Sequence, residues 1–150
     1  SIGGSAMGGG IGCHAGVFSN AYDLAELGQT WLAGGTFKDV QLVREDILNI
    51  WTQRGFPEGD NRRGVAFDKP ALEPDTGPTS DLASWESFGH SGFTGTLIWV
   101  DPAFDLVYVF LSNRTFPDAD NTRLLRLDTR TEIQRVVLEH LGATSRFSSN

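Results

Sequence analysis

The sequence predicts an α/β fold of the α+β type, in which an antiparallel sheet is flanked by helices. Two neighbouring runs, residues 96–100 and 106–111, are rich in β-branched and aromatic residues and are separated by the turn-forming stretch 101–105. Both runs are almost continuously apolar, which is typical of strands that are covered on both faces. Apolar residues spaced three to four positions apart, before and after this hairpin, supply the covering helices. The 150 residues are enough for one domain with its own core.

The first predicted helix covers residues 21–32, where apolar residues recur at helical spacing. Ser19 is the expected N-cap, and Gly34 stands where the helix would end. A second, shorter helix is expected at 44–53. Its predicted inward-facing residues are Ile47, Ile50 and Trp51.

Turn-forming residues dominate 54–88, which we expect to be mostly irregular apart from a short strand at 64–67. A last helix is expected over 125–141. Its predicted inward-facing residues are Ile133, Val136, Val137 and Leu141. The final residues, 143–150, form a polar tail that we expect to fray. The expected organisation is therefore a single domain unit over 1–142, which we expect to be the C-terminal part of a larger domain, followed by this tail.

The composition excludes several classes of protein. The formal net charge is -7, and no run of Lys or Arg marks the chain as a nucleic-acid binder. Cys13 is the only cysteine, so no disulfide can form within the chain. The longest apolar run, residues 106–111, is far too short to span a bilayer. The chain starts with Ser1 rather than Met, and we expect it to be part of a longer protein.

Residues 88–96, just before the hairpin, combine several glycines with the pair His90 and Ser91. Glycine lets the backbone approach a ligand closely, and N–H groups at the start of a strand can bind a developing oxyanion. A glycine-rich turn that leads into a strand is an equally good interpretation of this pattern alone. The pattern is not the Gly-x-Ser-x-Gly elbow, because Phe93 takes the last position.

Residues 89–95 read Gly-His-Ser-Gly-Phe-Thr-Gly and resemble the third active-site motif of the class C β-lactamase, DD-peptidase and esterase family. That motif reads Lys-Thr-Gly in many members and His-Thr-Gly or His-Ser-Gly in others. Residues 15–25 resemble an upstream stretch of the same family, and residues 98–102 and 110–114 resemble its strands around the hairpin. The resemblance covers residues 8–141 and implies a β-lactamase/transpeptidase-like fold, of which this chain is the C-terminal portion.

The resemblance implies a role for each residue of the motif. His90 would polarise the site and help to relay a proton, and Ser91 would hydrogen-bond the substrate. Phe93 would give its backbone N–H to the oxyanion hole, while Gly92 would leave room for the acyl group. The further substrate-binding candidates are Gly16 and Trp85. Neither a cofactor nor a metal ion is expected.

The family's nucleophile, a Ser in Ser-x-x-Lys, and its Tyr-x-Asn motif do not occur in these 150 residues. The positions three before Lys38 and Lys69 are Gly35 and Ala66. By resemblance, both motifs belong to an upstream half of the same domain, which is the expected partner of this chain, and the protein is expected to be exported or periplasmic. Because a His is often neutral where a Lys is charged, peptidase or esterase chemistry suits His90 at least as well as β-lactam hydrolysis.

Two classes of function stay open: an acyl-transfer hydrolase acting on peptidoglycan peptides, β-lactams or esters, and a non-catalytic module of the same fold that binds cell-wall material or partner domains. An unrelated hydrolase that pairs Ser91 with His90 is a weaker alternative, because neighbouring strand residues point to opposite faces. Two further candidates are weaker. Cys13 with His14 could be a nucleophile or metal ligands, but no other Cys or His stands at metal-ligand spacing. The acidic turn 118–121 could imitate a Ca²⁺ loop, but the required Gly and distal Glu are missing. Alone, the chain is expected to expose apolar surface and to self-associate.

Overall fold

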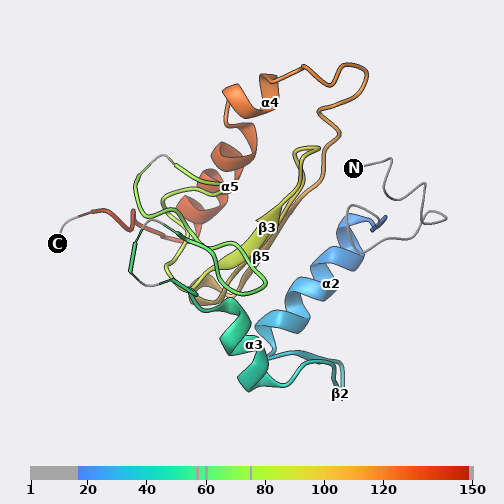
Figure 1. Cartoon of the computed structure of the whole chain (residues 1–150), viewed down its shortest axis with the longest axis vertical. Helices are drawn as coiled ribbons and strands as arrows, with labels where there is room; N and C mark the ends of the chain where they lie inside the picture. Colours follow the sequence, from blue (N-terminus) through green and yellow to red (C-terminus); the bar gives the residue numbers. More distant parts are fainter. Residues whose placement is uncertain (1–16, 57, 60, 75, 149–150) are drawn as a thin grey trace.

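The computed structural model describes residues 17–56, 58–59, 61–74 and 76–148. Its main sheet consists of three antiparallel strands in the order β3-β4-β5. These strands are β3 (Phe88–Ser91), β4 (Leu97–Asp101) and β5 (Leu106–Phe110). Figure 1 shows helix α2 (Ala21–Leu32) and helix α5 (Thr129–His140) on either side of this sheet. The predicted α/β class, with an antiparallel sheet flanked by helices, is confirmed.

The β4–β5 hairpin forms where the two β-rich runs predict it. Its turn is a short 3-10 helix, η1 (Pro102–Phe104), because proline suits the first helical position. The carboxylate of Asp101 accepts hydrogen bonds from the backbone N–H of Ala103 at 3.2 Å and of Ser84 at 2.8 Å. This buried charge therefore has partners, and it ties the turn to the segment that leads into β3.

The two faces of the sheet pack against different helices. Val107 meets α2 at Gly28, and its register partner on β4 is Val100. Tyr108 points the other way and donates a hydrogen bond from its hydroxyl to the carbonyl of Arg130 in α5, at 3.0 Å. Its register partner, Trp99, is almost fully buried. The period-two alternation of strand side chains thus fills both faces, which is why the strand sequences are apolar throughout.

Helix α2 begins one residue later than Ser19 would place it. The side chain of Asn20 accepts hydrogen bonds from the backbone N–H groups of Tyr22 at 2.9 Å and Asp23 at 3.1 Å, so Asn20 is the N-cap. The expectation that Ser19 caps the helix is wrong, because its hydroxyl bonds to the carbonyl of Asn20 instead. Gly34 follows the helix with a φ of 65°, a conformation that glycine adopts without strain.

A small sheet and a two-turn helix follow α2. They are β1 (Thr36–Phe37), β2 (Val40–Gln41) and α3 (Glu45–Thr52). In α3 the buried residue is Leu48, whereas Ile50 is 55% exposed and Trp51 is also exposed. The predicted inward face, which included both Ile50 and Trp51, is therefore wrong. In so short a helix the apolar spacing is compatible with more than one face, and tertiary packing selects Leu48.

The predicted strand at 64–67 does not form. The N–H of Gly64 donates to the carbonyl of Phe67 at 2.9 Å, which folds this segment into a turn. Only Asp68 pairs in a β manner, through a single bridge to Gly89 in β3. The apolar run is short, and turn geometry within it overrides its strand propensity.

The predicted C-terminal helix is divided into two parts. They are α4 (Arg123–Arg126) and α5, separated by Asp128 with a φ of 44°. The buried residues of α5 are Gln134 and Leu138, whereas three of the four predicted inward residues are exposed. These exposed residues are Ile133, Val136 and Leu141. Gln134 can be buried because its Oε1 accepts the backbone N–H of Ser80 at 2.9 Å.

None of the helices in the described residues is long and apolar enough to cross a membrane. The described part of the tail, residues 143–148, packs against the segment before β3, so the expectation that it frays is wrong. The Arg146 guanidinium donates from Nη1 to the carbonyls of Ser80 at 2.8 Å and Ala83 at 2.7 Å. Burial lowers the pKa of Arg146 to about 10, which leaves it cationic at neutral pH.

We expect Gly28→Ala to lower the free energy of unfolding by about 1–3 kcal/mol, because an added Cβ would collide with Cγ1 of Val107. Urea denaturation followed by circular dichroism measures the change. The double variant Gly28→Ala/Val107→Ala should recover part of the loss attributed to the collision. A Gly28→Ala variant that is more stable than the parent, as at an unhindered helix position, would contradict this close approach.

Candidate functional site

The glycine-rich motif lies at the end of β3, which is held on both sides near Gly89. On one side Gly89 pairs with Trp99 of β4. On the other, the N–H of Asp68 donates to the carbonyl of Gly89 at 2.8 Å, and the N–H of Gly89 donates to the carbonyl of Asp68 at 3.0 Å. A Cβ at Gly89 would collide with the carbonyl oxygen of Ile98, so only glycine fits.

The turn after β3 carries the predicted oxyanion donor, the backbone N–H of Phe93. Within the described residues this N–H donates to no other group, so it is available to a ligand. The carbonyl of Phe93 accepts a hydrogen bond from Nε of Arg114 at 2.8 Å, and the hydroxyl of Ser112 donates to the carbonyl of Thr94 at 3.0 Å. The turn is thus braced by the chain that follows β5. Gly95, with a φ of 93°, closes it.

His90 stands exposed on β3 and is fixed at both ring nitrogens. Its Nδ1 lies 2.8 Å from the carbonyl oxygen of Ser91. Its Nε2 lies 3.1 Å from Nη1 of Arg63. A side chain this exposed would otherwise sample several rotamers, so these two contacts define its orientation.

Arg63 reaches His90 from the segment between α3 and β3, where Asp68 anchors it. Asp68 is 1% exposed, and its carboxylate accepts a hydrogen bond from Nη2 of Arg62 at 3.0 Å. Nε of Arg63 lies 3.7 Å from the same carboxylate. No sequence pattern marks Arg62, Arg63 or Asp68 as site residues, because the contact with His90 spans 27 residues and comes from an irregular segment.

The side chains of Ser91 and His90 are not hydrogen-bonded to each other. The Ser91 hydroxyl has no hydrogen bond to His90 or to another described residue, and the two residues are successive in β3. Gly92 is exposed and donates its N–H to the carbonyl of Thr96 at 2.8 Å. Ser91, Gly92 and the free N–H of Phe93 therefore form a short polar edge next to His90.

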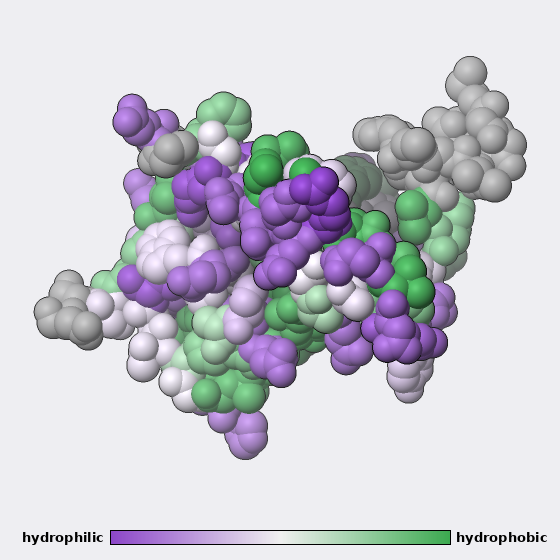
Figure 2. All heavy atoms as spheres, turned by 90° about the horizontal axis from the view of Figure 1, so that it is seen from below, coloured by the Kyte–Doolittle hydropathy of each residue, from purple (hydrophilic) through white to green (hydrophobic). Residues whose placement is uncertain are grey.

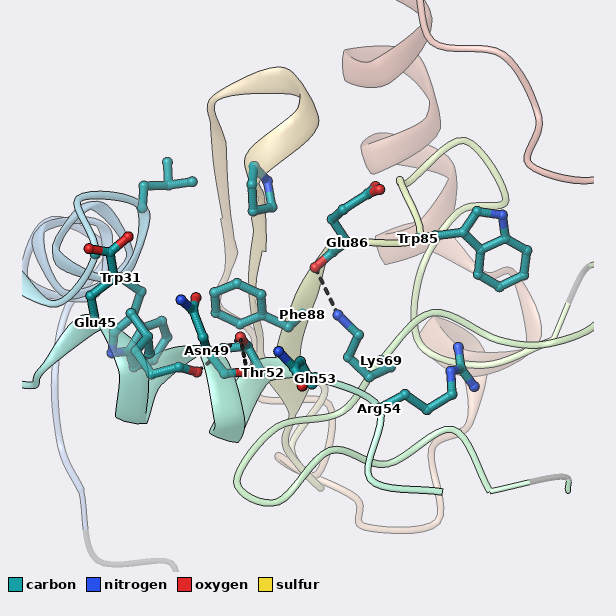
Figure 3. Close-up of a pocket in the computed structure, with 14 residues that line it drawn as sticks. Trp31, Glu45, Asn49, Thr52, Gln53, Arg54, Lys69, Trp85, Glu86 and Phe88 are labelled. Carbon is teal, nitrogen blue, oxygen red and sulfur yellow. Dashed lines mark hydrogen bonds between the residues drawn. The ribbon is translucent and has the colours of Figure 1, made fainter. Parts of the chain in front are cut away.

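The other predicted site residues lie elsewhere or are outside the described residues. Trp85 does not lie with His90: it lines a cavity of about 510 Å³ between α3, the end of α2 and the start of β3. In Figure 3, Trp85 and Arg54 lie at one end of this cavity and Trp31 at the other. Gly16, like Cys13 and His14, lies outside the described residues.

This cavity contains a buried lysine, Lys69, which is 5% exposed. Its Nζ donates to the carbonyl of Glu86 at 2.8 Å, the hydrogen bond drawn in Figure 3. Burial, and secondly the charge of Arg54, lower the pKa of Lys69 to about 8. Within the described residues, no three His, Cys, Asp or Glu side chains are grouped so as to hold a metal ion.

The fold, the glycine-rich motif and the order of the elements define a domain of the serine-hydrolase type. The family model named Beta-lactamase matches residues 3–131. The chain therefore belongs to the β-lactamase family.

Individual relatives agree with this membership. A protein of Escherichia coli (strain K12) named "Putative D-alanyl-D-alanine carboxypeptidase" is 38% identical over 106 residues, which are 71% of this chain and 24% of that protein. A protein of the same name from Salmonella newport (strain SL254) is 34% identical over 116 residues, 77% of this chain and 26% of that protein. A β-lactamase crystal structure from Mycobacterium bovis matches with a TM-score of 0.63 and 27% identity, over 82% of this chain and 44% of that one. The chain thus spans about a quarter of the length of these curated relatives.

We expect the free energy of unfolding to rise by about 2 kcal/mol between pH 7 and pH 9.5 through Lys69 alone. The pKa of Lys69 is about 8 in the folded chain and near its ordinary value of 10.5 in the unfolded chain. Between these values the unfolded chain binds more protons, so raising the pH favours folding. Urea denaturation at several pH values measures the rise. In Lys69→Met the rise should be smaller by this amount, and an unchanged pH dependence would show that Lys69 titrates normally.

Proposed function

We propose that this chain supplies the third-motif side of an acyl-transfer active site in a longer serine hydrolase. The observation that carries the proposal is the free backbone N–H of Phe93, which lies on a braced turn directly after His90 and Ser91. A donor fixed in this way can stabilise an oxyanion without reorganising during the reaction. Membership of the β-lactamase family supports the same chemistry.

The nucleophile would come from a Ser-x-x-Lys segment outside these 150 residues. A serine hydroxyl is a weak nucleophile unless a neighbouring base accepts its proton, and the Lys of that segment is the proposed base. As the serine oxygen attacks the carbonyl carbon, the carbonyl oxygen becomes negative, and the Phe93 N–H would donate to it. Water then hydrolyses the acyl-enzyme. In this scheme the Ser91 hydroxyl binds the substrate, and Gly92 leaves room for the acyl group.

The proposed substrates are peptides ending in D-alanine, with esters as the second choice. Two observations support the peptide: the names of the E. coli and Salmonella relatives, and a His in the motif position where many β-lactamases have Lys. Cell-wall peptides lie outside the cytoplasmic membrane, so we also propose that the longer protein is exported or periplasmic. The alternative, a non-catalytic module that binds the same peptides, requires that the longer protein lack Ser-x-x-Lys.

We expect His90→Ala, made in a longer protein that carries Ser-x-x-Lys, to lower kcat/KM on a D-Ala-D-Ala peptide by about 10²- to 10⁴-fold. The melting temperature should change little, because His90 is exposed and removing an exposed side chain costs little stability.

The matched control is His140→Ala, another exposed histidine, at the end of α5. It should leave kcat/KM unchanged. The 150-residue chain alone should take up no label from a fluorescent penicillin. Full activity of His90→Ala would remove His90 from the site, and labelling of the isolated chain at Ser91 would overturn the proposed nucleophile.

We also propose that the upstream half of the domain covers apolar surface that this chain exposes. Within the described residues β5 has β4 as its only neighbour, so its outer edge is open. Val136 on α5 is 65% exposed, and Ile133 beside it is exposed too. Figure 2 shows further apolar side chains among polar ones on the face that it displays. Open strand edges and apolar helix faces associate readily, so without its partner the chain would bind its own copies.

We expect the isolated chain to form dimers or larger species in light scattering after gel filtration. Val136→Lys should shift this distribution toward the monomer, because a charge on the apolar face of α5 opposes burial. The matched control is His140→Lys, which adds the same charge at an exposed polar position of α5. This variant should not shift the distribution toward the monomer. A chain that is monomeric at every concentration tested would contradict the proposed surface.

A further inference from the structure

We infer that Arg63 is a positioning residue that holds His90 as the neutral imidazole protonated on Nδ1. The inference deepens the proposed function, since it assigns the state in which His90 meets a substrate. It rests on the contact between Nη1 of Arg63 and Nε2 of His90, at 3.1 Å, and on the contact of Nδ1 with the carbonyl oxygen of Ser91, at 2.8 Å.

The two contacts of the imidazole ring lead to the same tautomer independently. A carbonyl oxygen only accepts hydrogen bonds, so Nδ1 of His90 must carry the proton that it donates to Ser91. A guanidinium only donates, so Nε2 must present its lone pair to Arg63. The surroundings thus select one of the two tautomers of the neutral His90 ring.

Arg63 can do this because its half-exposed side chain is drawn toward the motif by Asp68. The buried carboxylate of Asp68 lies 3.7 Å from Nε of Arg63. The backbone of Asp68 is joined to the backbone of Gly89 by two hydrogen bonds. Gly89 immediately precedes His90, so the anchor and the residue that it orients are tied to the same point of β3. Arg62 binds the same carboxylate at 3.0 Å, whereas the contact with His90 belongs to Arg63.

The tautomer affects the turn as well as the ring. The Nδ1–H of His90 holds the carbonyl of Ser91, and therefore the orientation of the peptide group between Ser91 and Gly92. The backbone N–H that follows this peptide group is that of Phe93. His90 thus braces one end of the turn, as Arg114 braces the other through the carbonyl of Phe93. A substrate group that binds Nε2 must be a donor, and it must replace Arg63.

The test is a long-range ¹H–¹⁵N correlation spectrum of the histidine rings in the 150-residue chain, recorded at pH 8. The chain has three histidines, and His90→Gln identifies the signals of His90 by their loss. We expect the pattern of an imidazole protonated on Nδ1. Arg63→Met should return His90 to the mixture that a solvent-exposed histidine shows, and Arg63→Lys, which keeps a donor, should restore the Nδ1–H form in part.

Arg62→Met is the matched control: it removes a neighbouring arginine from the same carboxylate and should leave the His90 spectrum unchanged. If the parent chain shows Nε2–H, or if Arg63→Met leaves the spectrum as it was, the inference is wrong. In the longer protein Arg63→Met should lower kcat by about 10- to 100-fold with a smaller change in KM, and Arg62→Met should not. The spectrum can be recorded without any catalysis. An inactive longer protein would therefore contradict the proposed function, but the spectrum alone would still decide the tautomer of His90.

Discussion

Two backbone hydrogen bonds join Asp68 to Gly89, and the arrangement of the whole site depends on them. They attach the long segment after α3 to the strand that carries the motif. Once Asp68 is fixed there, its carboxylate brings Arg62 and Arg63 to the motif, while the next residue, Lys69, enters the cavity beside Glu86. The strand that carries this pairing has room only for glycine at Gly89, because an added Cβ would collide with the carbonyl oxygen of Ile98 and with Trp99 in β4. A single glycine therefore permits both the pairing and the placement of the charges.

The packing around this bridge combines apolar contact with polar groups that have partners. On the α2 side, Phe67 lies edge-on to Trp31 at 4.9 Å and to Phe88 at 5.0 Å, which covers the start of β3 with aromatic rings. On the α5 side, Trp99 and Leu138 fill the interior. The buried polar groups of this side, Asp101 and Gln134, bond to backbone N–H groups of the segment before β3. That irregular segment is thus held by hydrogen bonds to buried side chains of the hairpin and of α5, which compensates for its lack of regular structure.

The hairpin and the first helix were predicted correctly, whereas the N-cap at Ser19, the strand at 64–67 and the long-range contacts were not. The hairpin, the first helix and the motif at the end of β3 depend on residues close together in the chain, so their patterns could be interpreted directly. The buried face of α5 could not, because Gln134 is buried only when Ser80, 54 residues earlier, supplies its partner. The same applies to the contact of Arg63 with His90, which depends on pairing between segments rather than on spacing. Gly16, Cys13 and His14 lie outside the described residues, so the predictions for them stay predictions.

The described tail matters for where a shorter version of this chain could end. Helix α5 stops at His140, and Gly142 would be the natural place to cut by secondary structure alone. A fragment ending there would lose Arg146, and with it both hydrogen bonds to the carbonyls of Ser80 and Ala83. The carbonyl of Ser80 would keep the N–H of Ala83 as a partner, at 3.2 Å, but the carbonyl of Ala83 would lose its hydrogen bond. A buried carbonyl without a partner costs about 1–3 kcal/mol, a large share of what holds a small domain together. A truncation or a fusion joint is therefore better placed after residue 148 than within residues 141–148.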